Sequence, residues 1–338
     1  MRLFQQFSPR AIGIAAAAVT VVMWTSFIVV ARASADPARG VTLGPFDMAF
    51  ARILGASTIL LPWGWWLVRR DRARGAGASS MFGFSPLPLS VTASAGLFAG
   101  VFYALLAYIG FGFAPAGHAS VLMPGSLPLW TALLAALVLR TRITPARAMG
   151  LALIVAGDVL VGGRSLLHAF EGGQVWIGDL LFMASALSWS IYSVLARKHA
   201  LDAVRATVAV TAFAFFTYLP VYALLLVFDL IPARLLSAPM GDVAFQMLFQ
   251  GVGSVVIAGI TFTRMIQQFG PVRSTMITAL VPGLSALGAA FFLGEPLYWN
   301  LSAGLMLVTL GILFGVRATA APVNQPLSPP AVAARMGG

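Results

Sequence analysis

Ten stretches of about twenty mostly apolar residues follow one another along this chain of 338 residues, joined by short connections. A hydrocarbon core about 30 Å thick is crossed by roughly 20 helical residues at about 1.5 Å each. Lipid offers no partner to an unpaired backbone amide, so such stretches must form helices. We therefore predict an all-α integral membrane protein with ten transmembrane helices. The expected spans are residues 11–31, 46–68, 89–111, 115–139, 145–162, 177–196, 204–228, 243–263, 272–293 and 298–316.

The composition indicates a chain that lies almost entirely within the lipid bilayer. Hydrophobic residues make up 59% and charged residues only 9%, whereas a soluble domain has about a quarter of its residues charged. The net charge of +11 raises the question of a nucleic-acid partner. The arginines are scattered among short connections and form no basic domain, so membrane topology explains them and no nucleic acid is expected. The sequence has no cysteine, which excludes disulfides and thiolate metal sites, and no nucleotide-binding loop, so we expect no cofactor and no metal.

Arginine and lysine alternate between rich and poor connections, and this alternation sets the topology. With the N-terminus inside, connections on the inner face carry 16 of these residues and those on the outer face carry 4, with Arg52 alone inside a span. Together with a composition rich in Ala, Gly and Arg, the pattern favours a multi-pass protein of a bacterial inner (plasma) membrane with both termini in the cytoplasm. Residues 33–35 resemble a signal-peptide cleavage site, but the preceding apolar run exceeds the roughly 7–15 residues of a signal core.

A segment of the first half of the chain recurs 154 positions later with no gap. Pro128 then matches Pro282 and Gly157 matches Gly311, which are rarer coincidences than matches of alanine or leucine. Internal duplication is common in transporters, and five helices per copy would place the second copy upside down in the membrane. We therefore predict two inverted five-helix repeats. The expected organisation is a cytoplasmic N-terminus at 1–10, repeats at 11–162 and 177–317, a periplasmic loop at 163–176 and a disordered cytoplasmic tail at 318–338.

Four segments resemble a known family, the EamA-type transporters of the drug/metabolite transporter superfamily. Residues 23–27 (MWTSF) are similar to its W-G-x-x-F region, and residues 50–52 (FAR) are similar to its F-x-R motif. Residues 178–192 resemble the start of its second repeat, and residues 293–297 (LGEPL) resemble its L-G-E-x-L loop. The resemblance spans about 11–317. It implies a ten-helix bundle of two inverted repeats that transports small solutes.

The sequence departs from the family pattern at two places. The loop that closes the first repeat has Arg140 and Thr141 where the family has Gly-Glu, so the role of that carboxylate is lost. Arginine suits the positive inner face on which this loop is expected to lie. Thr25 replaces the usual glycine of the first motif, so the first helix is expected to pack less closely against its neighbour.

Aromatic and hydroxyl side chains far from the membrane interfaces are the first candidates for a solute site. Rings can stack on a flat or apolar solute while their N–H and O–H groups reach its polar end, although helix packing is an alternative use of the same rings. Trp189 and Tyr192, for example, share a helix face at i, i+3. The expected solute-binding residues are Trp24, Arg52, Tyr103, Tyr108, His118, Trp189, Tyr192, Ser274 and Thr278.

Arg52 is the only cation deep within an expected span. A charge at that depth costs about 2.5–3.5 kcal/mol on insertion scales, so it requires a partner or a wet cavity. Arg52 is expected either to clamp a solute carboxylate or to pair structurally with Asp158 or with helix-end carbonyls. Asp158 and Asp47 are expected near the outer interface, where water can hydrate a carboxylate. His118 is expected near the same interface, where a histidine can titrate or simply form a hydrogen bond.

Prolines and glycines indicate how the helices bend and pack. Pro128 and Pro282 lie inside expected spans, where each frees a backbone carbonyl and permits a bend, so we expect these repeat-matched prolines to be hinges. Other spans carry glycines spaced for close helix contact, and these spans are expected to serve as scaffold. The glycines concerned are Gly150, Gly157, Gly304, Gly311 and Gly315.

The sequence thus predicts a transporter, and not an enzyme, that exports small organic metabolites such as amino acids or amphipathic and aromatic compounds. The expected mechanism is alternating access through one central cavity, driven by the solute gradient or by proton exchange, in a monomer or homodimer. The alternatives are a proton-coupled drug antiporter, an intramembrane enzyme and a non-transporting membrane scaffold or sensor. The first span has no carboxylate, which argues against small-cation antiport, and the histidines at 118, 168 and 199 lie in separate regions, which argues against an enzyme.

Overall fold

The computed structural model describes residues 9–75, 77–140 and 142–317. Within these residues the fold is all α-helical, and β structure is limited to one isolated bridge between Ser80 and Ser85. The expected tail at 318–338 and most of the N-terminal segment at 1–10 lie outside the described residues. Helices long and apolar enough to cross a membrane number seven in the described part, at Arg10–Ala35, Leu89–Phe113, Ala116–Val138, Pro145–Ala169, Val175–Lys198, Ala203–Val227 and Met240–Met265. Two shorter apolar helices occupy Leu280–Leu293 and Trp299–Gly315.

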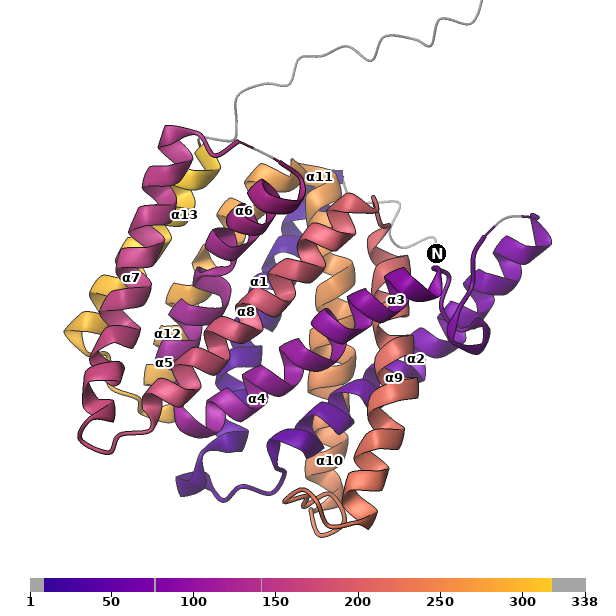
Figure 1. The fold of residues 1–338 in the computed structure, drawn as a ribbon, viewed down its shortest axis with the longest axis horizontal. Coiled ribbons are helices and arrows are strands. Elements are labelled where there is room, and N and C mark those ends of the chain that lie inside the picture. Colours follow the sequence, from indigo (N-terminus) through magenta and orange to yellow (C-terminus); the bar gives the residue numbers. More distant parts are fainter. Residues whose placement is uncertain (1–8, 76, 141, 318–338) are drawn as a thin grey trace, which may run out of the picture.

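The helices pack side by side into a bundle, and several spans are built from successive helical segments (Figure 1). Segments η4, η5 and η6 are π-helical, a wider turn that often marks a functional site. The elements are α1 (Pro9–Ala35), η2 (Pro37–Arg39), α2 (Pro45–Ala73), η3 (Met81–Gly83), α3 (Leu89–Ala95), η4 (Gly96–Phe102), α4 (Tyr103–Phe113), α5 (Ala116–Ser120), η5 (Val121–Gly125), α6 (Leu127–Val138), α7 (Pro145–Ala169), α8 (Val175–Lys198), α9 (Ala203–Val227), α10 (Met240–Gln246), η6 (Met247–Ile257), α11 (Ala258–Thr278), α12 (Leu280–Leu293) and α13 (Trp299–Arg317).

Side chains at the helix termini fix where several helices begin and end. The Asp47 carboxylate accepts the backbone N–H of Gly44 at 2.8 Å, just ahead of α2. Thr144 and Asp202 accept backbone N–H groups in the same way at the starts of α7 and α9. These acceptors satisfy amides that have no partner within the helix. After α12, Gly294 adopts φ 71°, a left-handed conformation that glycine adopts without steric cost.

α7 is longer than the sequence predicts. It continues to Ala169, so that only residues 170–174 separate it from α8 in place of the expected loop at 163–176. The polar residue Ser165 does not end the helix, because its hydroxyl bonds back to the carbonyl of Gly162 at 2.8 Å. The extension places Asp158 in the middle of α7, 13 residues after Pro145 and 11 before Ala169, whereas the sequence predicts it near the end of a shorter helix.

The connection between the eighth and ninth expected spans is helical, whereas the sequence predicts a loop between residues 263 and 272. α11 runs unbroken through it, yet the chain reverses direction within this element. The first part of α11 runs antiparallel to α1, and α12 runs parallel to α1. The contacts that show this are Gly13 with Phe269, Thr20 with Thr261, Ile277 with the cluster of Ala16 and Ala17, and Gly288 with Val29.

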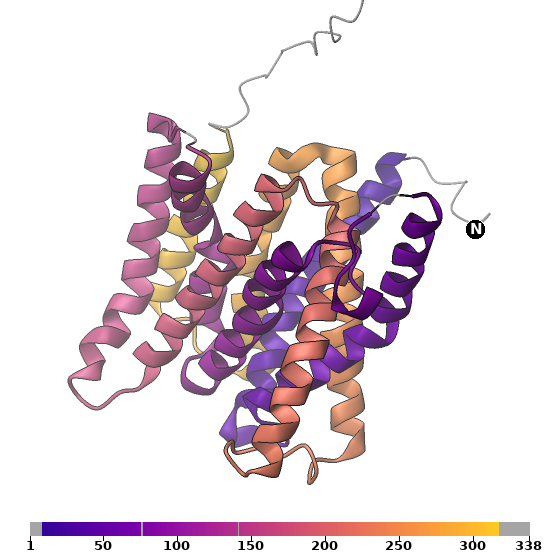
Figure 2. The ribbon, with the colours of Figure 1, turned by 45° about the vertical axis from the view of Figure 1, so that its right-hand side comes forward.

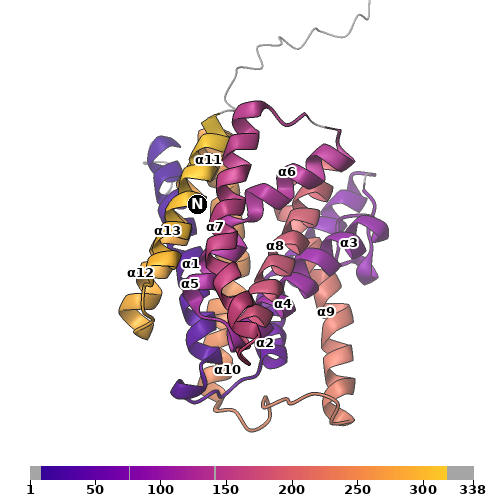
Figure 3. The same ribbon diagram turned by 60° about the vertical axis from the view of Figure 1, so that its left-hand side comes forward.

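α7 and α13 pack against each other along one edge of the bundle, as Figures 1 and 3 both show. Their contact is formed by backbone atoms, because a Cβ added at Gly150 would lie only 2.6 Å from the carbonyl oxygen of Gly311. Seven residues further along α7, a Cβ added at Gly157 would lie 2.8 Å from the carbonyl oxygen of Gly304. The predicted close contact through small residues is therefore confirmed. At the opposite edge, α2 packs between α9 and η6 (Figure 2).

Candidate functional site

A cavity lies near the middle of the bundle, where α1, α2, α4 and α8 face the broken spans η5–α6 and α11–α12. Its water-accessible interior is about 70 Å³, which is room for about five water molecules. Most of its walls are apolar or aromatic. The lining residues are Trp24, Phe27, Ile28, Arg52, Tyr103, Met123, Pro124, Leu127, Ala186, Trp189, Ser254 and Val281.

Two of the spans that line the cavity break beside it. α6 begins at Leu127, directly after the π-helix η5, and α12 begins at Leu280, directly after a break at Ala279. The two predicted hinges, Pro128 and Pro282, each lie in the first turn after such a break. A proline has no backbone N–H, so neither residue can donate a hydrogen bond back along its span. Broken helices of this kind form the solute sites of many transporters, because their free backbone groups and their bends face the binding cavity.

π-helical turns bring two further residues to the cavity. η4 ends immediately before Tyr103, and η6 contributes Ser254. The sequence analysis did not identify Ser254, because nothing in its apolar surroundings marks a π segment. It also missed Leu127 and Val281, although these two residues are 154 positions apart and so occupy matching positions of the duplicated segments. The repeat offset was therefore a usable signal for both.

Arg52 carries the only charge among the lining residues. Its guanidinium carbon lies 5.5 Å from the centre of the Phe27 ring, which is a cation–π contact. Nη1 of Arg52 is buried and has no hydrogen-bond partner among the described residues. The hydroxyl of Tyr108 lies close to Arg52 but outside hydrogen-bonding geometry, and it is likewise without a partner in the described part of the chain. The cavity wall therefore contains a cation with a buried donor that is unpartnered among the described residues.

The alternative in which Arg52 pairs with Asp158 is wrong. Both carboxylate oxygens of Asp158 lack a hydrogen-bond partner among the described residues. The expectation that Asp47 is hydrated is also wrong, since its side chain is completely buried. Asp47 accepts the backbone N–H groups of Gly44 and Arg234, both at 2.8 Å, and the hydroxyl of Tyr222. Two of these donors come from more than 170 residues away in the sequence, which is why the sequence alone did not reveal them.

Aromatic rings from α1, α4 and α8 form one wall of the cavity. The ring centres of Tyr103 and Trp189 are 4.9 Å apart, and those of Phe27 and Tyr103 are 6.5 Å apart. These separations fall in the range in which aromatic pairs attract one another. Tyr192 packs behind Trp189 at 5.3 Å and Tyr108 packs against Phe27 at 6.1 Å, so both support the wall without lining the cavity.

The structure brings together four of the nine predicted solute-binding residues as lining residues: Trp24, Arg52, Tyr103 and Trp189. Tyr108 and Tyr192 lie directly behind them. Ser274, which is buried, and Thr278 lie on α11 and are not among the lining residues. His118 lies at the start of α5, at one end of the bundle, and we call this end of the molecule the α5 end.

At the α5 end, His118 belongs to a hydrogen-bonded cluster. Its Nδ1 lies 2.8 Å from one carboxylate oxygen of Asp179, and the other oxygen of Asp179 accepts the hydroxyl of Ser165. Ser165 thus donates to the carboxylate and not to the imidazole. A nucleophilic serine requires the opposite arrangement, with the histidine as its base. The cluster therefore lacks the geometry of a hydrolase site.

Glu295 ties three other elements together at the same end. Its carboxylate accepts Nε of Arg32 at 3.0 Å and the backbone N–H groups of Ala116 and Gly117 at 3.2 and 3.3 Å. Arg32 also donates to the carbonyl of Phe111 at 2.7 Å. The contacts join α1, α4, the start of α5 and the connection between α12 and α13. Charge-assisted hydrogen bonds of this kind are stronger than neutral ones.

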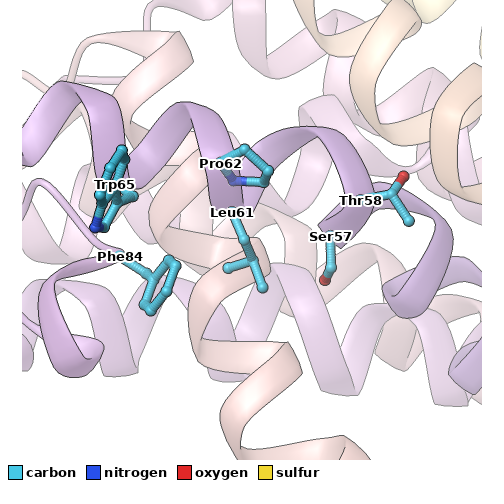
Figure 4. Close-up of a pocket in the computed structure, with 6 residues that line it drawn as sticks. All are labelled: Ser57, Thr58, Leu61, Pro62, Trp65 and Phe84. Atoms are coloured by element: carbon cyan, nitrogen blue, oxygen red, sulfur yellow. The ribbon is translucent and has the colours of Figure 1, made fainter.

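A larger hollow, of about 390 Å³, lies on the surface of α2 beside Pro62 (Figure 4). It is open and apolar, and the hydroxyls of Ser57 and Thr58 on its wall are bonded to carbonyls of their own helix at 2.7 Å. Trp65, which is 42% exposed, and Phe84 form its far end. Apart from these two hydroxyls and the Trp65 indole N–H the wall is apolar, so the groove is a surface suited to lipid tails.

The apolar helices and their packing define a multi-pass membrane protein with a central cavity. The sequence model of the EamA-like transporter family matches residues 11–163 and 176–317. This chain belongs to the EamA-like transporter family, and the resemblance noted in the sequence is confirmed.

Individual relatives agree with this assignment. An uncharacterized transporter of Archaeoglobus fulgidus is 27% identical over 296 residues, which cover 84% of this chain and 90% of that protein. The uncharacterized transporter YyaM of Bacillus subtilis is 24% identical over 195 residues, which cover 57% of this chain and 62% of that protein. A solved crystal structure superposes with a TM-score of 0.56 at 22% identity, over 92% of this chain and 98% of the other, and so shares the fold.

Proposed function

We propose that this transporter exports small organic solutes that combine a carboxylate with an apolar or aromatic part, such as amino acids and amphipathic compounds. The observation that carries the proposal is the buried guanidinium of Arg52, whose Nη1 is unpartnered among the described residues in a cavity walled by Trp24, Tyr103 and Trp189. A carboxylate would supply the missing acceptor, and the rings would cover the apolar part of the solute. No step of this function requires a catalytic group, a cofactor or a nucleotide.

The proposed architecture is ten spans in two inverted five-helix repeats, with both termini in the cytoplasm and the α5 end on the outer side of a bacterial inner membrane. Two separate matches to the family model, at 11–163 and 176–317, support the duplication. So does the recurrence of irregular turns, since η4 and η6 occupy corresponding spans and the helix breaks before Leu127 and Leu280 lie about one repeat offset apart. The bias of Arg and Lys between the connections supports the orientation.

The proposed mechanism is alternating access, in which the two repeats move so that the central cavity opens to either side in turn. Sites for small ligands commonly enclose about 300–1,000 Å³, whereas this cavity has about 70 Å³ accessible to water. The cavity must therefore widen to accept a solute. The breaks beside Pro128 and Pro282 supply the places where the lining helices can bend.

Solute exchange by purified protein in liposomes tests the proposal. The vesicles are loaded with unlabelled tryptophan, and entry of labelled tryptophan is compared with entry of labelled tryptamine, which has the same ring system without the carboxylate. We expect exchange of tryptophan, and we expect Arg52→Met to reduce it much more than it reduces entry of tryptamine. Arg69→Met is the matched control, since Arg69 lies outside the cavity, 3.7 Å over the Trp65 ring.

Two outcomes would count against the proposal. Equal loss for both compounds in Arg52→Met would assign Arg52 a structural role and remove it from the solute site. If folded protein exchanged no amino acid, aromatic compound or sugar phosphate from a broad panel, a membrane scaffold or sensor would become the better explanation.

A further inference from the structure

α7 carries an acid that has no partner and lies outside the central cavity. Asp158 is 6% exposed, and both of its carboxylate oxygens lack a hydrogen-bond partner among the described residues. It lies 13 residues after the start of α7 and 11 before its end. At a rise of 1.5 Å per residue, this is about 16–20 Å from either end of the helix. Asp158 is therefore a buried acid at the middle of a helix long enough to cross a membrane.

The surroundings of Asp158 favour a neutral carboxyl group. An unpaired charge in the middle of a membrane span costs several kcal/mol, and a buried carboxylate avoids this cost by holding a proton. A metal ion is the other way to neutralise an acid, but the described residues contain no group of three His, Cys, Asp or Glu side chains that could hold one. The ligand that fits a lone carboxylate is a proton.

Few charged groups face Asp158 from the elements that pack against α7. The described parts of η5 and α6 contain none, and the one charged residue of α13 is Arg317, at its last position. On α8, Arg197 and Lys198 lie at the far end, while Asp179 lies in the first turns. Arg164 of α7 itself contacts Asn300 and Tyr298. No cation of these elements is therefore placed to stabilise the ionised form of Asp158.

A polar cluster of Ser165, Asp179 and His118 lies on the α5 side of Asp158. Ser165 is seven residues further along α7 on the same face, about 10 Å away along the helix axis, and it donates to Asp179. Between them lies Gly162, which has no side chain and faces the Asp179 carboxylate. Asp179 in turn contacts His118, whose side chain is 15% exposed. Histidine changes its charge near neutral pH and is a frequent proton carrier in proteins.

We propose that Asp158 is a proton-binding site reached from the α5 end through His118 and Asp179, and that its protonation is coupled to solute movement. The coupling part rests on the function proposed above, whereas the proton site does not. The closed packing around α7 accommodates Asp158 only with its proton bound. When the proton leaves, the carboxylate requires water, so ionisation favours a state in which the packing of α7 against α8 and η5 has opened.

The interface with η5 links Asp158 to the central cavity. η5 supplies Met123 and Pro124 to the cavity wall and packs against α7. Gly157, the residue next to Asp158, is in backbone contact with α13, so α7 stays held against α13. Hydration of Asp158 therefore displaces η5 and α8, which both line the cavity. Proton binding at Asp158 and solute binding in the cavity then affect each other, because both depend on the positions of η5 and α8.

Chemical labelling of the wild-type protein tests the proton site without any solute. Dicyclohexylcarbodiimide adds to protonated carboxyl groups in apolar surroundings, and the mass of the peptide that contains Asp158 reports the product. We expect labelling of Asp158 that decreases as the pH is raised, because the ionised form does not react. Asp47 and Asp179, whose oxygens accept hydrogen bonds, are expected to stay unlabelled. Absence of label on Asp158 at every pH, or labelling that ignores pH, overturns the proton site.

Transport in liposomes with a pH gradient tests the coupling. We expect the gradient to change the net flux of labelled tryptophan in the wild type and in Asp229→Asn, an exposed acid used as the matched control. We expect Asp158→Asn to lose this response. Tryptophan exchange that ignores the gradient in the wild type removes the coupling and leaves the transporter function intact. Absence of exchange in the wild type instead contradicts the proposed function, while the labelling still decides whether Asp158 binds a proton.

Discussion

The central cavity and the α5 end of the bundle differ in whether their buried polar atoms have hydrogen-bond partners. In the cavity, Arg52 keeps an unpartnered donor among the described residues, and Tyr108 behind it keeps an unpartnered hydroxyl. At the α5 end, Glu295 accepts three hydrogen bonds and Asp179 accepts two. A buried polar atom without a partner costs about 1–3 kcal/mol. The comparison therefore separates groups that hold the helices together from groups that remain available to a ligand.

The same contrast occurs within pairs of like residues. Asp47 and Asp158 are both buried aspartates on long helices, yet Asp47 accepts three hydrogen bonds and Asp158 accepts none from the described residues. Both side chains are buried and of the same type, so the main chemical difference between them is the presence of partners. Substitutions that remove the acid at each position can therefore show whether unpartnered groups are indeed dispensable for folding.

The largest effect is expected on stability, for Asp47→Ala. The substitution leaves the N–H groups of Gly44 and Arg234 and the hydroxyl of Tyr222 buried without an acceptor, which should cost about 3–5 kcal/mol. Thermal unfolding in detergent, followed by loss of monodisperse protein, measures the change. Asp158→Asn is the matched variant and should unfold at the wild-type temperature or above it. Comparable losses in the two variants would show that Asp158 is a structural residue and would break the comparison.

The next effect is expected on transport, for Arg52→Met. Loss of a charge-assisted hydrogen bond worth about 1.5–3 kcal/mol should reduce exchange of carboxylate solutes about 10- to 150-fold. The free energy of unfolding should stay the same or rise, since an apolar side chain replaces an incompletely paired charge. Initial exchange rates and thermal unfolding of the same preparation measure both effects. A variant that is inactive and also unstable would place Arg52 with the groups that hold the bundle together.

The apolar wall of the cavity should contribute less than its charge. Trp189→Leu removes the ring that packs against Tyr103 at 4.9 Å. Because an aromatic pair is worth about 0.5–1.5 kcal/mol, the KM for tryptophan should rise about two- to twelvefold. Exchange of leucine should change little in this variant. Trp65→Leu is the control and should change neither exchange, since Trp65 lies in the surface groove of α2. Equal losses for tryptophan and leucine would mean that Trp189 supports packing only.

The smallest effect is expected at the opposite end of the bundle, where Asp71 and Arg205 form an ion pair at 2.7 Å. The hydrogen bond from Arg205 holds the pKa of Asp71 below its usual value of 3.8. A lowered pKa means that the stabilisation is present above the unfolded-state pKa and is lost as the pH falls through the folded-state pKa. Asp71→Asn should therefore lower the unfolding temperature only slightly near pH 7, as is usual for surface ion pairs. The difference should disappear in strongly acidic medium, and a difference that persists there would require another cause.

Much of the fold could be predicted because about twenty apolar residues in a row have few other structures open to them. The π-helical segments could not be predicted, because the sequence of η6, for example, is as apolar as that of a regular helix. What distinguishes η6 is its contact with α2, where a Cβ added at Gly55 would lie 2.1 Å from the carbonyl oxygen of Met247. Such a close approach depends on a residue nearly 200 positions away, so no local pattern indicates it.

The candidate site divides in the same way. Arg52, Tyr103 and Trp189 were predictable, since charge and aromatic rings far from the membrane interfaces are unusual enough to be noticed. Ser274 and Thr278 were expected in the site only because of their hydroxyls. Their place depends on the rotation of α11, which is set by the helical turn that replaces the expected loop. The partners of Asp47 and Glu295 could not be predicted, because each pairing joins segments that meet only in the folded bundle.

The backbone contact between α7 and α13 also limits how the molecule can move. Backbone atoms of the two helices are in contact at Gly150 and Gly311, so the helices have no room to slide past each other. The two helices belong to different halves of the chain. In the alternating access proposed above, the seam between them is the expected axis of rotation for the two halves. Displacement grows with distance from an axis, so α7 and α13 stay nearly still while α2 and α9, at the opposite edge, travel furthest. The opening through which solutes reach the central cavity should accordingly form on the α2–α9 side.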